Sequence, residues 1–327
     1  MHLPHLRHHD GEPVHGQGHP LTGTGSPGRS SGAALPGDFY LDDQLCLFTL
    51  LYAPKEQHER ILADFVTPIA RDLRGEPGLD SLFFARYNVP SWQLRFRVLG
   101  RPDWVSGPVF ERVRRELEPL QASGAVENVE FAQYDRETER YGGEEGMALA
   151  EKLFLHDSLA VLDFMELDRQ DRLDKTRREV SLLMTERLLD LLRFDRGQRT
   201  AFYEFGQQWP HEMGTWSESD VATIEAKYQE VKDGLRELFT GEQAGDPETL
   251  WGGEEAARIA ARWIEDSRPI AEAILEGHAA GRIRQDLNYL AWSYAHMSAN
   301  RMGIDATPEA ILRYFMYRLY QDGGGAP

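Results

Sequence analysis

The chain has 327 residues, of which 41% are hydrophobic, so it has enough apolar side chains for a core and is not wholly disordered. Its 36 basic residues are outnumbered by 54 acidic ones, and this formal net charge of −18 argues against binding to a nucleic-acid backbone. No run approaches the roughly 18 consecutive apolar residues of a membrane-spanning helix, and the start lacks an apolar signal-peptide core. We expect a cytoplasmic protein without direct nucleic-acid or membrane contact.

The first 37 residues differ in composition from the rest. They are rich in Gly and Pro and have no hydrophobic period, which predicts a disordered tail over residues 1–37. The tail contains six histidines, namely His2, His5, His8, His9, His15 and His19. They can be interpreted as metal ligands or as part of a solvated tail. Because ordering a flexible segment costs conformational entropy, the solvated tail is the favoured interpretation.

The next segment alternates strands with helices. Short apolar runs rich in aromatic residues predict strands at residues 44–52, 81–87, 92–99 and 126–134. Apolar residues spaced by three and four predict helices at residues 54–73 and near residues 109–120. The order strand–helix–strand–strand–helix–strand is the ferredoxin-like pattern, an antiparallel sheet with its helices on one face. The other face is then free for a second layer or a substrate.

From residue 144 onward the pattern is helical. Predicted helices cover residues 147–167, 180–192, 221–238, 256–274, 287–297 and 307–320. The last of them begins at Thr307-Pro308-Glu309, which resembles a capped helix start. Strands followed by helices indicate an α+β fold. We expect a sheet half at residues 38–143 and a helical half at residues 144–327, packed together as one catalytic unit.

The single cysteine, Cys46, excludes a disulfide framework or a thiolate metal cluster within one chain. It lies in an apolar stretch, which favours a buried and unreactive thiol. The sequence has no Walker or dinucleotide glycine loop and no Gly-x-Ser-x-Gly elbow. We therefore expect no cofactor and no resident metal.

Residues 93–98 place two arginines on one face of a strand. Side chains alternate along a strand, so Arg95 and Arg97 face one side while Leu94 and Phe96 face the other. Two guanidinium groups about 7 Å apart repel each other unless an anion lies between them, and their planar forks suit carboxylates. Two interpretations stay open, a carboxylate-binding face and a solvated sheet face; this strand alone favours the second.

A charged turn, residues 134–143, ends on Gly142 and Gly143 at the border of the two halves. Glycines allow backbone conformations that other residues rarely adopt, and functional residues often lie on such loops. Glu137 and Arg140 can pair locally, and that pairing alone is a sufficient account of both.

His296 is a candidate general acid or base. On a helix, His296 and Asn300 share one face, with Trp292 and Ser293 one turn earlier. A histidine so framed can move protons near neutral pH. The alternative is that it is a packing residue, which is the commoner role of a lone helical histidine.

These motifs have an order that is similar to a known family. They are Arg86-Tyr87 with Pro90, Leu94-Arg95-Phe96-Arg97, the turn 134–143 with Ala150-Glu151 and Asp157-Ser158, and His296-Met297 with Asn300-Arg301. Together they resemble the SpaB C-terminal domain family, the thiopeptide-type bacteriocin biosynthesis domains. The resemblance covers about residues 40–320 and omits the tail.

The resemblance implies a function on ribosomally made precursor peptides. One branch of the family is the elimination half of class I lantibiotic dehydratases, which removes glutamate from glutamylated Ser or Thr and leaves dehydroalanine or dehydrobutyrine. Stand-alone members in thiopeptide pathways include pyridine synthases, which join two dehydroalanines in a formal aza-[4+2] cyclisation and release the leader peptide. We expect the lyase; the cyclase is the alternative, and a non-catalytic peptide-binding scaffold is the third possibility.

The resemblance also implies which residues act. The family's elimination residues match Arg95, Arg97, Glu137, Arg140 and His296. Our hypothesis is that the three guanidiniums form a cationic cradle, that Glu137 holds one of them and that His296 moves the proton. Two departures from the family pattern point toward cyclisation, since Gln93 replaces a histidine and Val89 replaces an aspartate. For the cyclase, candidate proton donors are Tyr289, Tyr294, Tyr317 and Tyr320.

The implied partners are a precursor peptide with leader and core and a separate glutamylating dehydratase subunit. A sheet with a free edge also permits a homodimer.

Overall fold

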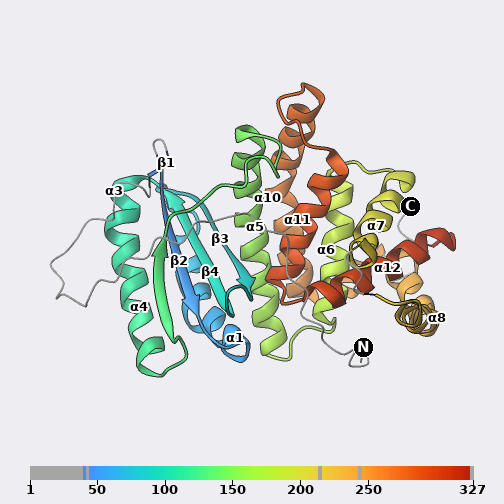
Figure 1. Cartoon of the computed structure of the whole chain (residues 1–327), viewed down its shortest axis with the longest axis horizontal. Coiled ribbons are helices and arrows are strands. Elements are labelled where there is room, and N and C mark those ends of the chain that lie inside the picture. Colours follow the sequence, from blue (N-terminus) through green and yellow to red (C-terminus); the bar gives the residue numbers. More distant parts are fainter. Residues whose placement is uncertain (1–39, 42–43, 213–215, 242–244, 325–327) are drawn as a thin grey trace.

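The computed structural model describes residues 40–41, 44–212, 216–241 and 245–324 (Figure 1). The predicted tail with its six histidines lies outside the described residues. Within the described residues, every strand precedes residue 133 and the chain from residue 144 onward is mainly helical. This arrangement confirms the α+β fold.

The strands form one antiparallel sheet. They are β1 (Tyr40–Leu41), β2 (Gln44–Tyr52), β3 (Leu79–Tyr87), β4 (Gln93–Gly100) and β5 (Asn128–Ala132). The spatial order is β5–β2–β4–β3, and the short β1 also pairs with β2. This is the ferredoxin-like order that the sequence predicts. Strand β5 is shorter than predicted because the N–H of Val126 turns back to bond the carbonyl of Leu120 at 3.3 Å.

Two helical segments cover one face of the sheet. The first is α1 (His58–Ile61), a π-helical turn (Leu62–Val66) and α2 (Thr67–Leu73); the second is α3 (Pro102–Trp104), another π-helical turn (Val105–Val109) and α4 (Phe110–Ala122). The single helix predicted at residues 54–73 is thus divided into shorter turns. Its apolar side packs on the sheet, where the rings of Phe65 and Phe96 lie 5.7 Å apart.

Helix α5 (Glu144–Arg169) covers the opposite face (Figure 1). The hydroxyl of Ser81 on β3 donates a hydrogen bond of 2.6 Å to the backbone carbonyl of Glu151. The rings of Phe83 and Phe154 lie 5.3 Å apart in the same interface. The face that the sequence leaves open for a second layer or a substrate is therefore occupied by a second layer.

The remaining helices continue the second layer away from the sheet (Figure 1). They are α6 (Arg177–Leu191), α7 (Arg196–Glu212), α8 (Glu218–Thr240), α9 (Pro247–Trp251), α10 (Glu254–Ala279), α11 (Leu287–Arg301) and α12 (Ala306–Gln321). Helices α7 and α9 are not predicted from the sequence. In α7, Gly197 and Gly206 weaken the helical pattern, and α9 is too short for a period to be visible. No described helix has the length and apolarity needed to cross a membrane.

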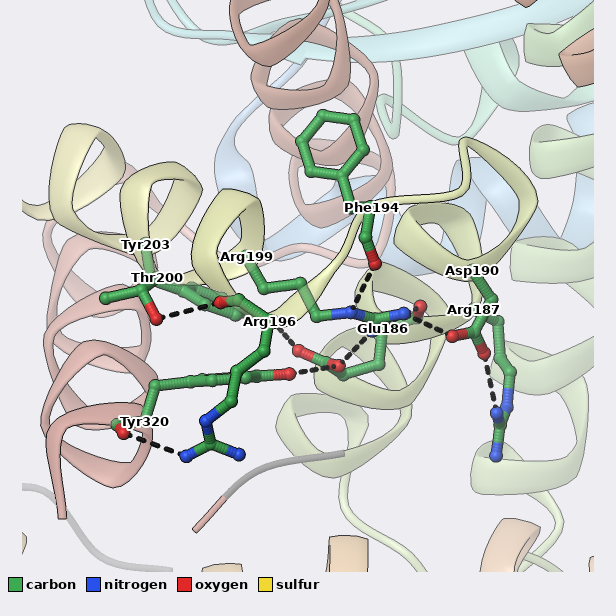
Figure 2. A network of polar contacts seen from close by, with 9 residues as sticks. All are labelled: Glu186, Arg187, Asp190, Phe194, Arg196, Arg199, Thr200, Tyr203 and Tyr320. Atoms are coloured by element: carbon green, nitrogen blue, oxygen red, sulfur yellow. Dashed lines mark hydrogen bonds and ion pairs between the residues drawn. The ribbon is translucent and has the colours of Figure 1, made fainter. Parts of the chain in front are cut away.

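A buried polar network joins α6, α7 and α12 (Figure 2). One carboxylate oxygen of Glu186 accepts hydrogen bonds from Arg199 Nη1 at 2.6 Å and from the Tyr320 hydroxyl at 2.8 Å. The other oxygen accepts from the Tyr203 hydroxyl, and Arg199 also contacts Asp190. We refer to these five residues as the Glu186 network. It fixes the position of α12 relative to its neighbours.

Cys46 is buried in β2, and burial raises the pKa of its thiol well above the usual range. The expected burial of the thiol is confirmed.

Candidate functional site

The charged turn is held against the segment that leads into α11. The backbone of Gly142 has a φ of 83°, and its carbonyl accepts a hydrogen bond from the N–H of Arg284 at 3.0 Å. A Cβ at this position would lie 2.9 Å from the backbone nitrogen of Gln285. Both the conformation and the close approach require glycine. The paired glycines therefore place the turn beside α11.

Arg140 connects the turn to α11. Its Nη1 donates to Glu137 Oε2 at 2.9 Å, which is the local pair expected from the sequence. Its Nε donates to the hydroxyl of Ser293 on α11 at 3.3 Å. Burial acts to lower the pKa of Arg140, but the adjacent Tyr141 and Glu137 outweigh it and raise the pKa. Arg140 thus stays charged in a half-buried position.

His296 is held on two sides. Its ring stacks on that of Trp292, with centroids 5.3 Å apart and planes 5° from parallel. Its Nδ1 lies 2.7 Å from Oε2 of Glu309 on α12, and 32% of the histidine side chain is exposed. Burial acts to raise the pKa of Glu309, but His296 and Arg313 outweigh it and lower the pKa. The imidazole is fixed by a carboxylate yet open to a substrate.

Arg95 lies flat on an aromatic ring. Its guanidinium carbon is 3.6 Å from the centroid of the Tyr87 ring, and its Nε donates to the side-chain oxygen of Gln93 at 3.4 Å. Burial lowers the pKa of Arg95. The amide nitrogen of Gln93 donates to the carbonyl of Val89 at 2.9 Å. Gln93 therefore connects Arg95 to the loop between β3 and β4.

Arg97 is more deeply enclosed. Its guanidinium carbon lies 4.0 Å from the ring centroid of Phe48, 4.9 Å from that of Tyr134 and 5.3 Å from that of Phe83. The faces of these rings stabilise its charge. Arg97 shares the sheet face of Arg95, as predicted, but its position suits support of the interface with α5.

The end of α11 is bonded to the edge of the sheet. The side-chain oxygen of Asn300 accepts from the N–H of Arg86 at 2.8 Å, and its nitrogen donates to the carbonyl of the same residue at 2.8 Å. The next residue, Arg301, donates from Nε to the carbonyl of Phe84 at 2.9 Å and from Nη1 to Asp157 at 2.7 Å. These bonds fix the register of α11 against β3.

Successive turns of α11 connect the charged turn with the edge of the sheet. Ser293, His296 and Asn300 follow one another along the helix. The hydroxyl of Ser293 accepts a hydrogen bond from Arg140. Asn300 is bonded to β3, the strand that pairs with β4 beside Arg95. His296 therefore lies between the two contacts. Helix α11 thus links Arg140, which it contacts directly, to β3, whose Tyr87 ring lies against Arg95.

An open depression of about 590 Å³ adjoins the charged turn. It is lined by Arg136, Glu137, Thr138, Glu139, Arg140, Gln285 and Tyr289. Arg95, Arg97 and His296 are not among its lining residues. A second cavity, beside Arg301, holds only about 10 Å³, room for about one water molecule, and a hollow of about 260 Å³ lies between α5 and α10, beside Asp163 and Arg258.

Glu309 and the four candidate tyrosines differ in burial and in whether they line the depression. Glu309 is missed by the sequence analysis, which assigns it to a helix cap, although α12 begins at Ala306 and the Glu309 side chain is buried against His296. Of the four tyrosines, Tyr294 is buried and Tyr320 belongs to the Glu186 network, while Tyr289 lines the depression. An acidic residue on the apolar face of a helix is the signal that identifies Glu309.

The described residues contain no group of three or more His, Cys, Asp or Glu side chains that could hold a metal ion.

Two curated proteins are similar to part of this chain. The subtilin biosynthesis protein SpaB of Bacillus subtilis is 31% identical over 123 residues, which is 38% of this chain and 12% of SpaB. The nisin biosynthesis protein NisB of Lactococcus lactis subsp. lactis is 25% identical over 139 residues, 42% of this chain and 13% of NisB. The matched region thus spans about an eighth of either relative.

Solved structures share the fold. The tRNA-dependent lantibiotic dehydratase MibB from Microbispora sp. 107891 superposes with a TM-score of 0.65 at 22% identity, over 92% of this chain and 29% of MibB. The pyridine synthase TbtD from thiomuracin biosynthesis superposes with a TM-score of 0.60 at 11% identity, over 85% of this chain and 98% of TbtD. TsrL gives a TM-score of 0.59 at 19% identity, over 85% of this chain and 95% of TsrL.

The family model described as lantibiotic biosynthesis dehydratase C-terminal matches residues 47–320, which is most of the chain and both of its halves. The chain therefore belongs to the family of lantibiotic biosynthesis dehydratase C-terminal domains.

Proposed function

We propose that this protein is a peptide-modifying lyase that eliminates glutamate from glutamylated Ser or Thr residues of a precursor peptide. The products are dehydroalanine and dehydrobutyrine. The observation that carries the proposal is a partly exposed imidazole, His296, on the helix that accepts a hydrogen bond from Arg140 through Ser293 and bonds the edge strand β3 through Asn300. Membership of the dehydratase family supports the same reaction class.

The reaction makes three demands on the site. A base must take the α-hydrogen, cations must stabilise the enolate-like charge, and the Cβ–O bond must break so that glutamate leaves as a carboxylate. His296 takes the proton, and the electron pair of the broken C–H bond becomes the new Cα–Cβ double bond. Arg95 and Arg140 face the developing negative charges. Glu137 orients Arg140, and Arg97 supports Arg95 from within the interface.

The proposed partners follow from this chemistry. The substrate is a precursor peptide with leader and core, and a separate glutamylating subunit supplies the activated Ser or Thr. We place both in the cytoplasm, where ribosomal peptides are made. The depression beside Arg140 and Tyr289 is the proposed contact for the peptide.

A pyridine synthase is the second candidate. It is favoured by the fold match to 98% of TbtD and by the position of Tyr289, which lines the depression together with Arg140. Tyr294 and Tyr320 do not suit the role of proton donor, because both are buried and Tyr320 already donates to Glu186.

One pair of assays separates the candidates. The purified chain is offered a glutamylated precursor peptide and, separately, a peptide with two dehydroalanines, and both reactions are followed by mass. Loss of glutamate from the first supports the lyase. Loss of leader peptide and water from the second supports the cyclase. If neither peptide changes, even with the glutamylating partner present, both candidates are rejected and the non-catalytic scaffold is the remaining assignment.

A further inference from the structure

The imidazole of His296 has one constrained and one open nitrogen. Nδ1 lies 2.7 Å from Oε2 of Glu309, while the second oxygen of this carboxylate accepts from Arg313 Nη2 at 3.2 Å. Glu309 and Arg313 are both buried, and the parallel ring of Trp292 covers one face of the imidazole. The exposed part of the side chain is therefore available to a substrate at a defined angle.

We propose that Glu309 is a positioning residue, which keeps the hydrogen of His296 on Nδ1 and leaves Nε2 as the atom that exchanges a proton with the substrate. This inference rests on the proposed function. A carboxylate accepts hydrogen bonds and donates none, so the nitrogen that faces it must carry the hydrogen. In a neutral imidazole the other nitrogen then has the free electron pair.

Arg313 determines which oxygen of Glu309 faces His296, because it bonds the other one. A guanidinium only donates, so Arg313 keeps Glu309 ionised and reserves one of its oxygens. The guanidinium carbon lies 5.0 Å from the ring centroid of Phe202 on α7. Helix α12 also contains Tyr320, about one turn after Tyr317. The Tyr320 hydroxyl donates a hydrogen bond to Glu186 (Figure 2). The Glu186 network thus anchors the helix on which Glu309 lies.

The arrangement makes Glu309→Gln an unusually informative change. Arg313 can donate only to the amide oxygen of the new side chain, so the amide nitrogen must face His296. That nitrogen donates to Nδ1, which forces the hydrogen of a neutral imidazole onto Nε2. The proton-accepting atom then faces away from the substrate. We expect turnover to fall about 10²–10⁴-fold, because an amide in place of the carboxylate beside a catalytic histidine selects the wrong tautomer.

The test is ¹⁵N NMR of the full chain labelled at histidine, at alkaline pH where the imidazole is neutral. The signals of His296 are assigned by their loss in His296→Gln. The native chain should show the hydrogen on Nδ1, and Glu309→Gln should show it on Nε2. Glu225→Gln is the matched control, since Glu225 also bonds α12 through Tyr314 and Arg318 but does not contact His296. It should leave the tautomer unchanged.

The outcomes separate this inference from the proposed function. A hydrogen on Nε2 in the native chain overturns the inference without any variant, so the test survives a failure of Glu309→Gln to fold. A tautomer that switches while glutamate elimination keeps its native rate overturns the positioning role. The expected tautomers in a chain that turns over neither peptide support the arrangement and reject the proposed function.

Discussion

The candidate site and the Glu186 network use the same chemical groups for different ends. In the Glu186 network, arginine, glutamate and two tyrosines are buried, and both carboxylate oxygens accept hydrogen bonds within the molecule (Figure 2). At the candidate site, Glu137 is 51% exposed beside Arg140, and 32% of the His296 side chain is exposed although its Nδ1 faces Glu309. The groups are similar, but their access to a ligand differs.

This difference separates a structural use of charge from a functional one. A fully bonded buried ion pair has no capacity left for a ligand, and its removal from water is costly, so its effect is on which helices pack together. A site must instead hold charged groups in place while leaving donors or acceptors open to the reacting atoms. At the candidate site, Arg140 and His296 are each held by a hydrogen bond within the molecule, while part of each side chain remains exposed to solvent.

The largest expected effect is on turnover. His296→Ala should lower the rate of glutamate elimination by about 10²–10⁴-fold, because it removes the general base. The circular dichroism spectrum and the midpoint of thermal unfolding should stay close to native, since the side chain is partly exposed. His278→Ala on α10 is the matched control and should retain the native rate. Equal rates in both variants would remove His296 from the mechanism.

The next effect is on stability. Glu186→Ala should lower the free energy of unfolding by about 3–5 kcal/mol, because Arg199 and the hydroxyls of Tyr203 and Tyr320 lose their buried acceptor and, among the described residues, Arg199 keeps only Asp190 as an ion-pair partner. Denaturant unfolding measures this loss. Glu230→Ala, which breaks the exposed ion pair with Lys227, should cost less than about 1 kcal/mol. Comparable losses in the two variants would show that the Glu186 network does not stabilise the helical half.

The buried imidazole of His58 should make stability depend on pH. Burial, with a smaller effect of Arg86, lowers the pKa of His58 from 6.5 to about 4. The unfolded chain therefore binds this proton more readily than the folded chain, and stability should fall as pH drops from 6.5 toward 4. The loss from this group is about 3 kcal/mol. Unfolding curves of the native chain and His58→Leu should differ in slope over this range; parallel pH profiles would contradict the prediction.

The smallest effect is expected at the rim of the depression. Glu137→Gln should change the free energy of unfolding by less than about 1 kcal/mol, because this ion pair is half exposed. Arg140 keeps its bond to Ser293, so turnover should fall far less than in His296→Ala. Arg140→Ala, which removes both contacts, is the comparison variant. A loss in Glu137→Gln as large as in Arg140→Ala would mean that Glu137 acts on the substrate itself.

Much of the fold was accessible from the sequence because its signals are local. The alternation of Leu94, Arg95, Phe96 and Arg97 predicts both a strand and its two faces, and the structure has this pattern in β4. Helix α7 was not predicted because Gly197 and Gly206 interrupt its apolar face, which becomes clear only from packing against α12. The π-helical turn inside 54–73 has no sequence signature that the periodic pattern can reveal.

Part of the candidate site could also be predicted from the sequence, because some of its contacts are local. Glu137 and Arg140 lie three residues apart, so their pairing follows from the local sequence. The contact of His296 with Glu309 depends on how α11 and α12 cross, which the sequence of either helix alone does not specify. The aromatic enclosure of Arg97 likewise comes from three further segments, β2, β3 and the charged turn, that the sequence of β4 does not specify.

The amide of Asn300 occupies the edge of β3 as a neighbouring strand would, since it satisfies both backbone groups of Arg86. Arg301 takes the carbonyl of Phe84 in the same way. An extended peptide, or a second copy of the chain, therefore finds this edge already closed to β-augmentation at these two residues. The opposite edge of the sheet, formed by β5, has no such bond to α11 in the described part of the chain and is the more accessible side for an added strand.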